Sequence, residues 1–163
     1  MMTHDILSIS AFLYNEARLL DDRQWDEWLS LYAEDVEFWL PCWTDEDTLV
    51  ESPTNAVSLL YYANRSGLED RIFRIKTERS GASSPEPRTV HQISNIEILE
   101  QNIHQIKLRF NWHTMIYRFK KIEQFFGQSF YTVQINGQQP QIKNKKVILM
   151  NDYINQVLDI YHI

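Results

Sequence analysis

Residues 12–41 read FLYNEARLLDDRQWDEWLSLYAEDVEFWLP, and their hydrophobic period changes along the stretch. The first part predicts an amphipathic helix, because apolar residues recur at three- and four-residue steps at Ile9, Phe12, Leu13, Ala17 and Leu20. Asp21 and Gln24 have the spacing of a capping box, which predicts the start of a second helix. The buried face of that second helix is predicted to hold Trp25, Trp28, Leu29 and Tyr32.

The last part of this stretch predicts a strand. Val36, Phe38 and Leu40 alternate with Glu37 and Trp39, which is the two-residue period of a β-strand. Pro41 ends the strand or marks a sheet edge. The tryptophans of this stretch are interpreted as core packing in preference to a ligand pocket.

Downstream, the sequence predicts a short strand at 57–63, a helix at 66–77, a loop at 80–87 and strands at 89–100, 104–119, 122–135 and 146–150. A phase slip at Ser94-Asn95 predicts a bulge, Gly127 a kink, and Asn136-Gly137 a hairpin turn. Because such long strands twist, we expect a strongly curved, mostly antiparallel sheet around the helices. The predicted fold is an α+β cone. The tail at 153–163 finishes the sheet or docks on a neighbouring molecule.

Composition limits the functional class. A chain of 163 residues is most simply one domain, so 1–163 is predicted to be a single unit. The formal net charge of −6 argues against nucleic-acid binding, which needs a cationic surface. The single cysteine excludes an intrachain disulfide and is compatible with a reducing compartment. We find no secretory signal and no apolar run that could span a membrane, so a cytoplasmic location is expected.

The sequence predicts no metal site. The five histidines are His4, His91, His104, His113 and His162, and the two nearest are nine residues apart. A Rieske cluster needs two cysteines and two histidines, which one cysteine excludes. An iron site of two histidines and one carboxylate could assemble from distant positions, but the spacing does not favour it.

Acid–base chemistry remains as an alternative. The acidic neighbours of Cys42 raise the pKa of a thiol, so a reactive thiolate is not expected. Within a cone, Asp35 and His91 could form a pair for general acid–base catalysis. The competing interpretation gives Asp35 a turn-capping role and His91 a structural or interface hydrogen bond. His113, on a polar strand face, is expected to contact solvent or a subunit.

Several segments in this order resemble the small (β) subunit of bacterial aromatic-ring-hydroxylating dioxygenases. The resemblance covers nearly the whole chain and rests on residues 12–41, LEDRIFRI at 68–75, PRTVHQISNIEI at 87–98 and FNWHTMIYRFKKIEQFFGQSFYTV at 110–133. The pieces HTMIYRFK and FFGQSFYTV, with the ending NDYINQVLDIYHI, are most similar to the branch that acts on anthranilate and benzoate.

This resemblance implies the cone fold of scytalone dehydratase and the nuclear-transport-factor-2-like (NTF2-like) domains. It implies a large α subunit as partner, in an α3β3 hexamer, which holds the Rieske [2Fe-2S] cluster and the mononuclear Fe(II). A separate reductase supplies electrons from NADH, and both atoms of O2 enter the ring. Anthranilate would yield catechol, CO2 and ammonia, and benzoate a cis-diol carboxylate. No catalytic, cofactor-binding or metal residue is carried over to this chain.

The leading prediction is therefore a non-catalytic structural subunit of such a dioxygenase, with anthranilate as first substrate and benzoate as second. The alternatives are a stand-alone, metal-free dehydratase or isomerase that uses Asp35 and His91, and an interaction module with neither role.

Overall fold

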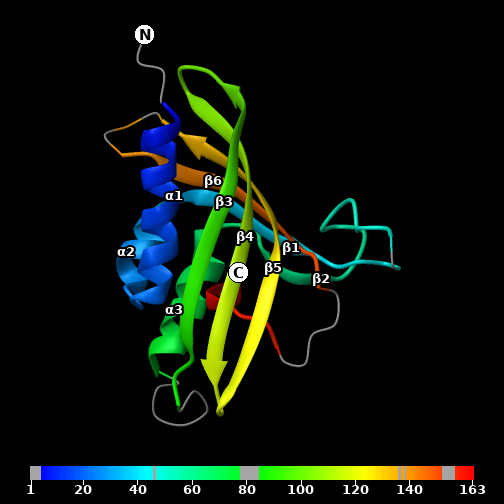
Figure 1. Ribbon diagram of the computed structural model, residues 1–163. Coiled ribbons are helices and arrows are strands. Elements are labelled where there is room, and N and C mark those ends of the chain that lie inside the picture. Colours follow the sequence, from blue (N-terminus) through cyan, green and yellow to red (C-terminus); the bar gives the residue numbers. More distant parts are fainter. Residues whose placement is uncertain (1–4, 46, 78–84, 136, 138, 152–156) are drawn as a thin grey trace.

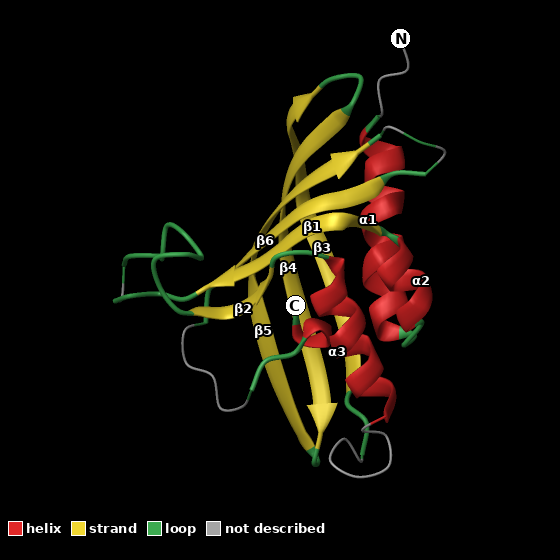
Figure 2. Ribbon diagram, turned by 180° about the vertical axis from the view of Figure 1, so that it is seen from behind, coloured by secondary structure: helices red, strands yellow, loops and turns green. Residues whose placement is uncertain are grey.

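The computed structural model describes residues 5–45, 47–77, 85–135, 137, 139–151 and 157–163. In these residues a six-stranded sheet curves along one side of three helices, as both views show (Figure 1, Figure 2). The predicted α+β class and the strongly curved sheet are confirmed.

The helices are α1 (Ile6–Asp21), α2 (Trp25–Ser30) and α3 (Arg65–Thr77). Helix α1 begins where the Asp5 carboxylate accepts a hydrogen bond from the Ser8 amide at 2.8 Å. The predicted capping box at Asp21 is wrong. Asp21 is the last residue of α1, and the N-cap position of α2 is Gln24, whose side chain makes no capping hydrogen bond. The Asp21 carboxylate is instead hydrogen-bonded to a strand, as described below.

The sheet has the strand order β2-β1-β6-β5-β4-β3. Neighbouring strands are antiparallel except β1 and β6, which are parallel. Tyr32, which we predicted on the second helix, begins the first strand. The strands are β1 (Tyr32–Pro41), β2 (Ser58–Tyr62), β3 (Arg88–Gln101), β4 (Gln105–Arg118), β5 (Lys121–Gln134) and β6 (Gln141–Leu149).

The long strands contain one bulge and one close backbone approach. The predicted bulge in β3 is confirmed, because the register with β4 shifts between Ser94 and Glu97 and Asn95 has a φ of 53°. At Gly127 the backbone of β6 lies close against β5. A Cβ atom at this position would lie 1.8 Å from the carbonyl oxygen of Ile148, so only glycine allows the two strands to pair here.

The tightest hairpin turn of the described residues lies at a position that no sequence pattern predicted. Arg118 pairs with Lys121, so Phe119 and Lys120 form a two-residue loop between β4 and β5, with φ values of 53° and 61°. Such a loop normally selects asparagine and glycine. The predicted Asn136-Gly137 turn connects β5 and β6, but that connection spans the residues between Gln134 and Gln141, and Asn136 lies outside the described residues.

Strand β6 begins five residues before the predicted start at Lys146. This part of the strand was not predicted, because Lys145 occupies an inward-facing position that an apolar residue would normally fill. The Lys145 side chain is buried there. Residues 153–156 of the predicted tail lie outside the described residues. In 157–163 the chain adds no strand to the sheet, and Leu158, Ile160 and Ile163 are buried in this chain's own core.

The core lies between the concave face of the sheet and the helices. Its largest fully buried side chains are Trp28, Tyr32, Phe38, Phe110, Leu13, Leu20, Leu40, Leu68, Leu108, Ile142, Leu149 and Ile160. Among the helices of the described residues, none has the length and hydropathy needed to cross a bilayer.

Candidate functional site

A buried ion pair lies at the centre of the cone. Glu16 of α1 and Lys145 of β6 are each only 2% exposed, and their Oε1 and Nζ atoms are 3.1 Å apart. The same carboxylate accepts hydrogen bonds from the Tyr32 hydroxyl at 2.5 Å, the Tyr131 hydroxyl at 3.1 Å and the Trp28 indole nitrogen at 3.3 Å. We call these five residues the Glu16 cluster. It ties α1 and α2 to β1, β5 and β6.

The electrostatics of the Glu16 cluster favour the carboxylate ion. Burial alone would raise the pKa of Glu16, but the charge of Lys145 and the hydrogen bonds from Tyr32, Lys145 and Tyr131 outweigh it, so the pKa is lowered. Burial, together with the charge of Glu16, raises the pKa of Tyr32 and of Tyr131 well above the usual value of 10.0. Both tyrosines are therefore neutral hydrogen-bond donors near neutral pH.

Sequence reasoning missed the Glu16 cluster, although one signal was present. Glu16 lies three residues after Leu13 and four before Leu20, so it falls on the apolar stripe of α1. A charged residue on such a stripe indicates a buried partner. The partner could not be identified, because Lys145 is distant in sequence and its strand was not predicted to extend that far.

The predicted pair of Asp35 and His91 does not form. The Asp35 carboxylate is exposed on β1 and pairs with Lys143 of β6 at 2.6 Å. Hydrogen bonding to Lys143 is the main reason that the pKa of Asp35 is lowered. The residue that meets His91 is Asp21, because the C-terminal end of α1 lies against the start of β3.

Asp21 makes two contacts with His91 and a third with Thr89. Its carboxylate lies 2.5 Å from His91 Nδ1 and accepts hydrogen bonds from the His91 amide at 3.0 Å and the Thr89 hydroxyl at 2.9 Å. Burial would raise the pKa of Asp21, but these bonds and the charge of His91 lower it. The His91 Nε2 atom is buried and has no hydrogen-bond partner among the described residues. An Asp–His pair therefore exists, but its aspartate is Asp21 and not the predicted Asp35.

Little space lies beside this pair. The cavity bounded by Glu16, His91, Ser129, Lys145 and Ile163 has a volume of about 20 Å³. A water molecule needs roughly 10–15 Å³ measured in this way. The cavity can accept one water molecule but no aromatic ring.

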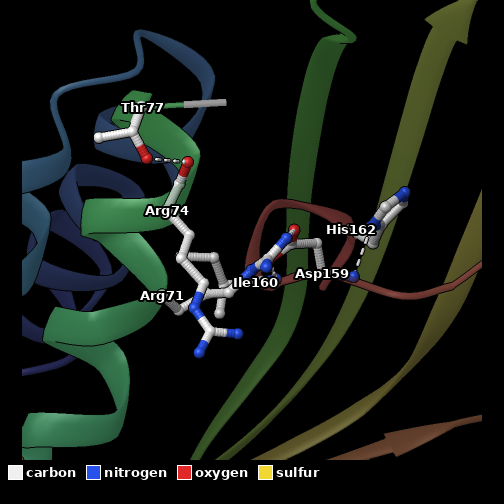
Figure 3. Close-up of polar contacts among 6 residues, drawn as sticks. All are labelled: Arg71, Arg74, Thr77, Asp159, Ile160 and His162. Carbon is white, nitrogen blue, oxygen red and sulfur yellow. Dashed lines mark hydrogen bonds and ion pairs between the residues drawn. The ribbon is translucent and has the colours of Figure 1, made fainter. Parts of the chain in front are cut away.

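The C-terminal segment fills the space between α3 and the sheet. Figure 3 shows Asp159 between Arg71 of α3 and His162, and the Asp159 carboxylate forms a two-pronged ion pair with the Arg71 guanidinium. The Asp159 amide donates to His162 Nδ1 at 2.7 Å, and the Asp159 side chain accepts from the Ile160 amide at 2.8 Å. His162 is 4% exposed, and burial lowers its pKa to about 4, so its ring is neutral.

The remaining candidates that the structure describes form no catalytic pair. Burial raises the pKa of the Cys42 thiol. His113 Nε2 lies 2.9 Å from Gln124 Oε1 on the outer face of the sheet, a contact within the chain. His104 lies beside a turn and His4 lies outside the described residues.

The residues do not fit the iron groups of a dioxygenase. One cysteine cannot hold a Rieske cluster, which needs two. Within the ranges that the structure describes, no three histidine, cysteine, aspartate or glutamate side chains lie close enough together to bind a metal ion.

Comparison with known proteins identifies the family. The model of the family described as ring hydroxylating beta subunit matches residues 15–156. The chain belongs to this family. It is therefore a β subunit of an aromatic-ring-hydroxylating dioxygenase system, and its partner is a large α subunit.

Three similar β subunits have names that refer to benzoates. The chain is 58% identical to the 2-halobenzoate 1,2-dioxygenase small subunit of Burkholderia cepacia, covering 96% of this chain and 95% of the relative. It is 56% identical to the toluate 1,2-dioxygenase subunit beta of Pseudomonas putida, covering 99% and 100%. It is 55% identical to the benzoate 1,2-dioxygenase subunit beta of Acinetobacter baylyi, covering 99% and 95%.

The anthranilate 1,2-dioxygenase small subunit of Acinetobacter baylyi is more distant. Its identity to this β subunit is 36%, with 96% of both chains covered. The predicted branch is thus confirmed, but the order of similarity within it places the benzoate-type relatives first.

Solved structures agree with this family. The β subunit of benzoate 1,2-dioxygenase from Burkholderia mallei has a TM-score of 0.87 and 48% identity, with 100% of both chains covered. A protein described as a putative scytalone dehydratase, from Novosphingobium aromaticivorans, has a TM-score of 0.66 at 19% identity, with 91% and 87% covered. The second likeness concerns the fold alone and confirms the predicted cone.

Proposed function

We propose that this chain is a non-catalytic structural subunit of a Rieske non-haem iron dioxygenase that dihydroxylates benzoate or a ring-substituted benzoate. The proposal treats residues 1–163 as one domain that works in the cytoplasm within an α3β3 hexamer. The α subunit would hold the [2Fe-2S] cluster and the mononuclear iron, and a reductase would supply electrons from NADH. Benzoate would yield a cis-diol carboxylate.

One observation carries the non-catalytic role: the interior of the cone is filled. Trp28 and Tyr32 occupy its centre, and Ile160 closes it beside α3. The cavity that remains beside His91 has about 20 Å³, far less than a benzoate needs. An aromatic substrate therefore does not fit inside the cone beside His91.

The choice of substrate rests on the relatives. The halobenzoate, toluate and benzoate subunits are 55–58% identical to this chain, whereas the anthranilate subunit is 36% identical. We therefore rank a benzoate first and anthranilate second.

The Asp21–His91 pair supports one alternative, a metal-free dehydratase or isomerase. A carboxylate that orients a histidine through Nδ1 leaves Nε2 available as a general base. The small cavity beside it weighs against this alternative, because a general base must reach the proton that it removes.

Co-expression with the large subunit tests the proposal. With the reductase and NADH supplied, the complex should convert benzoate to a cis-diol carboxylate, whereas this chain alone should bind no stoichiometric iron. The variant His91→Gln, assayed per assembled complex, should keep its activity within a factor of about two, because it removes only a structural hydrogen bond. The proposal fails if the wild-type chain forms no complex, or if His91→Gln abolishes turnover in a complex that still assembles.

A further inference from the structure

The β4–β5 hairpin tip, residues 117–122 with the sequence YRFKKI, combines exposed rings with positive charge. Phe119 is 63% exposed and Ile122 is 69% exposed at the end of the sheet. The guanidinium of Arg118 lies 4.6 Å from the centroid of the Phe119 ring. Neither Lys120 nor Lys121 has an ion-pair partner among the described residues. Exposed aromatic side chains beside arginine are typical of protein interfaces.

The backbone conformation of the hairpin tip indicates that its residues were not selected for ease of turn formation. Phe119 and Lys120 both have positive φ, a conformation that suits asparagine and glycine and strains a bulky side chain. Such strain at an exposed turn indicates that the side chains themselves are needed.

An acidic surface of matching character lies elsewhere on the same chain. Residues 42–45 and 47–57, which together we call the acidic loop, contain no lysine or arginine. Its exposed carboxylates in the described residues are Asp45, Asp47 and Glu51. In both views the acidic loop lies to one side of the sheet and the hairpin tip at the far end of β4 and β5 (Figure 1, Figure 2). One molecule therefore cannot bring its own tip and loop together.

We propose that the hairpin tip of one copy docks on the acidic loop of a second copy. Two chains with a net charge of −6 repel each other at long range, so their contact needs a place where opposite charges meet. The tip and the loop provide such a place. Because the two surfaces differ, the contact is head-to-tail, and head-to-tail contacts close into rings when the rotation allows it. The inference rests on the proposed function only for the number of copies, three in an α3β3 complex.

A charge swap tests this contact. The tip variant is Lys120→Glu with Lys121→Glu, and the loop variant is Asp47→Lys with Glu51→Lys, which spares the turn that the Asp45 carboxylate holds. Each variant should weaken association between copies by about tenfold or more, and their combination should restore it to within about threefold of wild type. The masses of the complex with the large subunit, measured at several concentrations, report the number of copies. Arg74→Glu and Glu34→Lys, exposed on α3 and β1, are the matched controls.

A second variant separates docking from folding. Phe119→Asn with Lys120→Gly should raise the melting temperature of the isolated chain, because it relieves the positive φ, and should weaken association between copies. The inference is overturned if the combined charge swap does not restore association. It is also overturned if the loop variant has no effect and the tip variant weakens binding to the large subunit rather than association between copies. In either case a wild-type complex with the large subunit leaves the proposed function intact.

Discussion

Glu16 is a carboxylate at a position where the periodicity of α1 calls for an apolar side chain. It is held by Lys145, two tyrosine hydroxyls and an indole nitrogen, so every partner in the Glu16 cluster depends on its charge. Burying an ion pair gains little over an apolar pair of the same size, but removing one partner leaves the other charge buried alone. The Glu16 cluster therefore specifies how α1 sits on the sheet.

The variant Glu16→Gln should lower the free energy of unfolding by about 3–5 kcal/mol, because it leaves the Lys145 ammonium buried without a counter-charge. Urea denaturation measures the change. The double variant Glu16→Leu with Lys145→Met is the matched control, and it should be more stable than Glu16→Gln. An unaltered denaturation midpoint for Glu16→Gln would contradict the role assigned to the ion pair.

His162 makes stability depend on pH. Burial holds its pKa at about 4 in the folded chain, below the usual 6.5, despite the opposing charge of Asp159. Between these values the unfolded chain binds more protons, so this contribution is complete above pH 6.5 and is lost as the pH falls toward 4. Its size is on the order of 3 kcal/mol.

The variant His162→Asn keeps an acceptor for the Asp159 amide but cannot titrate in this range. Its unfolding free energy should fall less steeply than that of wild type between pH 6.5 and 4. Urea denaturation at a series of pH values compares the two slopes. Identical slopes would show that His162 is accessible to protons in the folded chain.

At the scale of elements, Gly127 decides whether β5 and β6 can pair in register. The variant Gly127→Ala should destabilise the chain by about 3 kcal/mol, since its Cβ would overlap the backbone of Ile148, which cannot move away as a side chain could. Gly137→Ala, where a Cβ meets nothing within 4 Å, is the control and should be nearly neutral. Thermal denaturation of both variants checks the difference, and equal melting temperatures would refute the close approach.

The elements also show what the sequence could predict. Alternation marked β1 and β4 because most of their inward residues are apolar, and the phase slip at Ser94 marked the bulge of β3. The start of β6 was missed because Lys145 interrupts that alternation. Its ion-pair partner, Glu16, is distant in sequence. The Asp–His pair was half predicted: His91 was identified, but its aspartate depends on how the end of α1 meets β3, which no local pattern contains.

At the scale of the whole molecule, the C-terminal segment completes the core. The variant Asp159→Asn should lower the free energy of unfolding by about 2 kcal/mol, because it removes the buried charge from a partly buried ion pair with Arg71. Amide hydrogen exchange should become faster in residues 158–163. Asp35→Asn, which breaks an exposed pair with Lys143, should have little effect on either quantity. Unchanged exchange in Asp159→Asn would mean that apolar packing alone holds the segment.

The parallel pairing of β1 with β6 has a consequence for how the chain is made. Tyr32 pairs with Ile142, so β1, which is synthesised early, cannot complete its pairing until β6 is synthesised near the end of the chain. Domains form as units once their parts have left the ribosome, and pairings between distant strands form slowly. Until β6 emerges, the tryptophan-rich helices and the edge of β1 are uncovered. The nascent chain should therefore depend on chaperones during this interval, and low temperature, which weakens hydrophobic association, should increase its soluble yield.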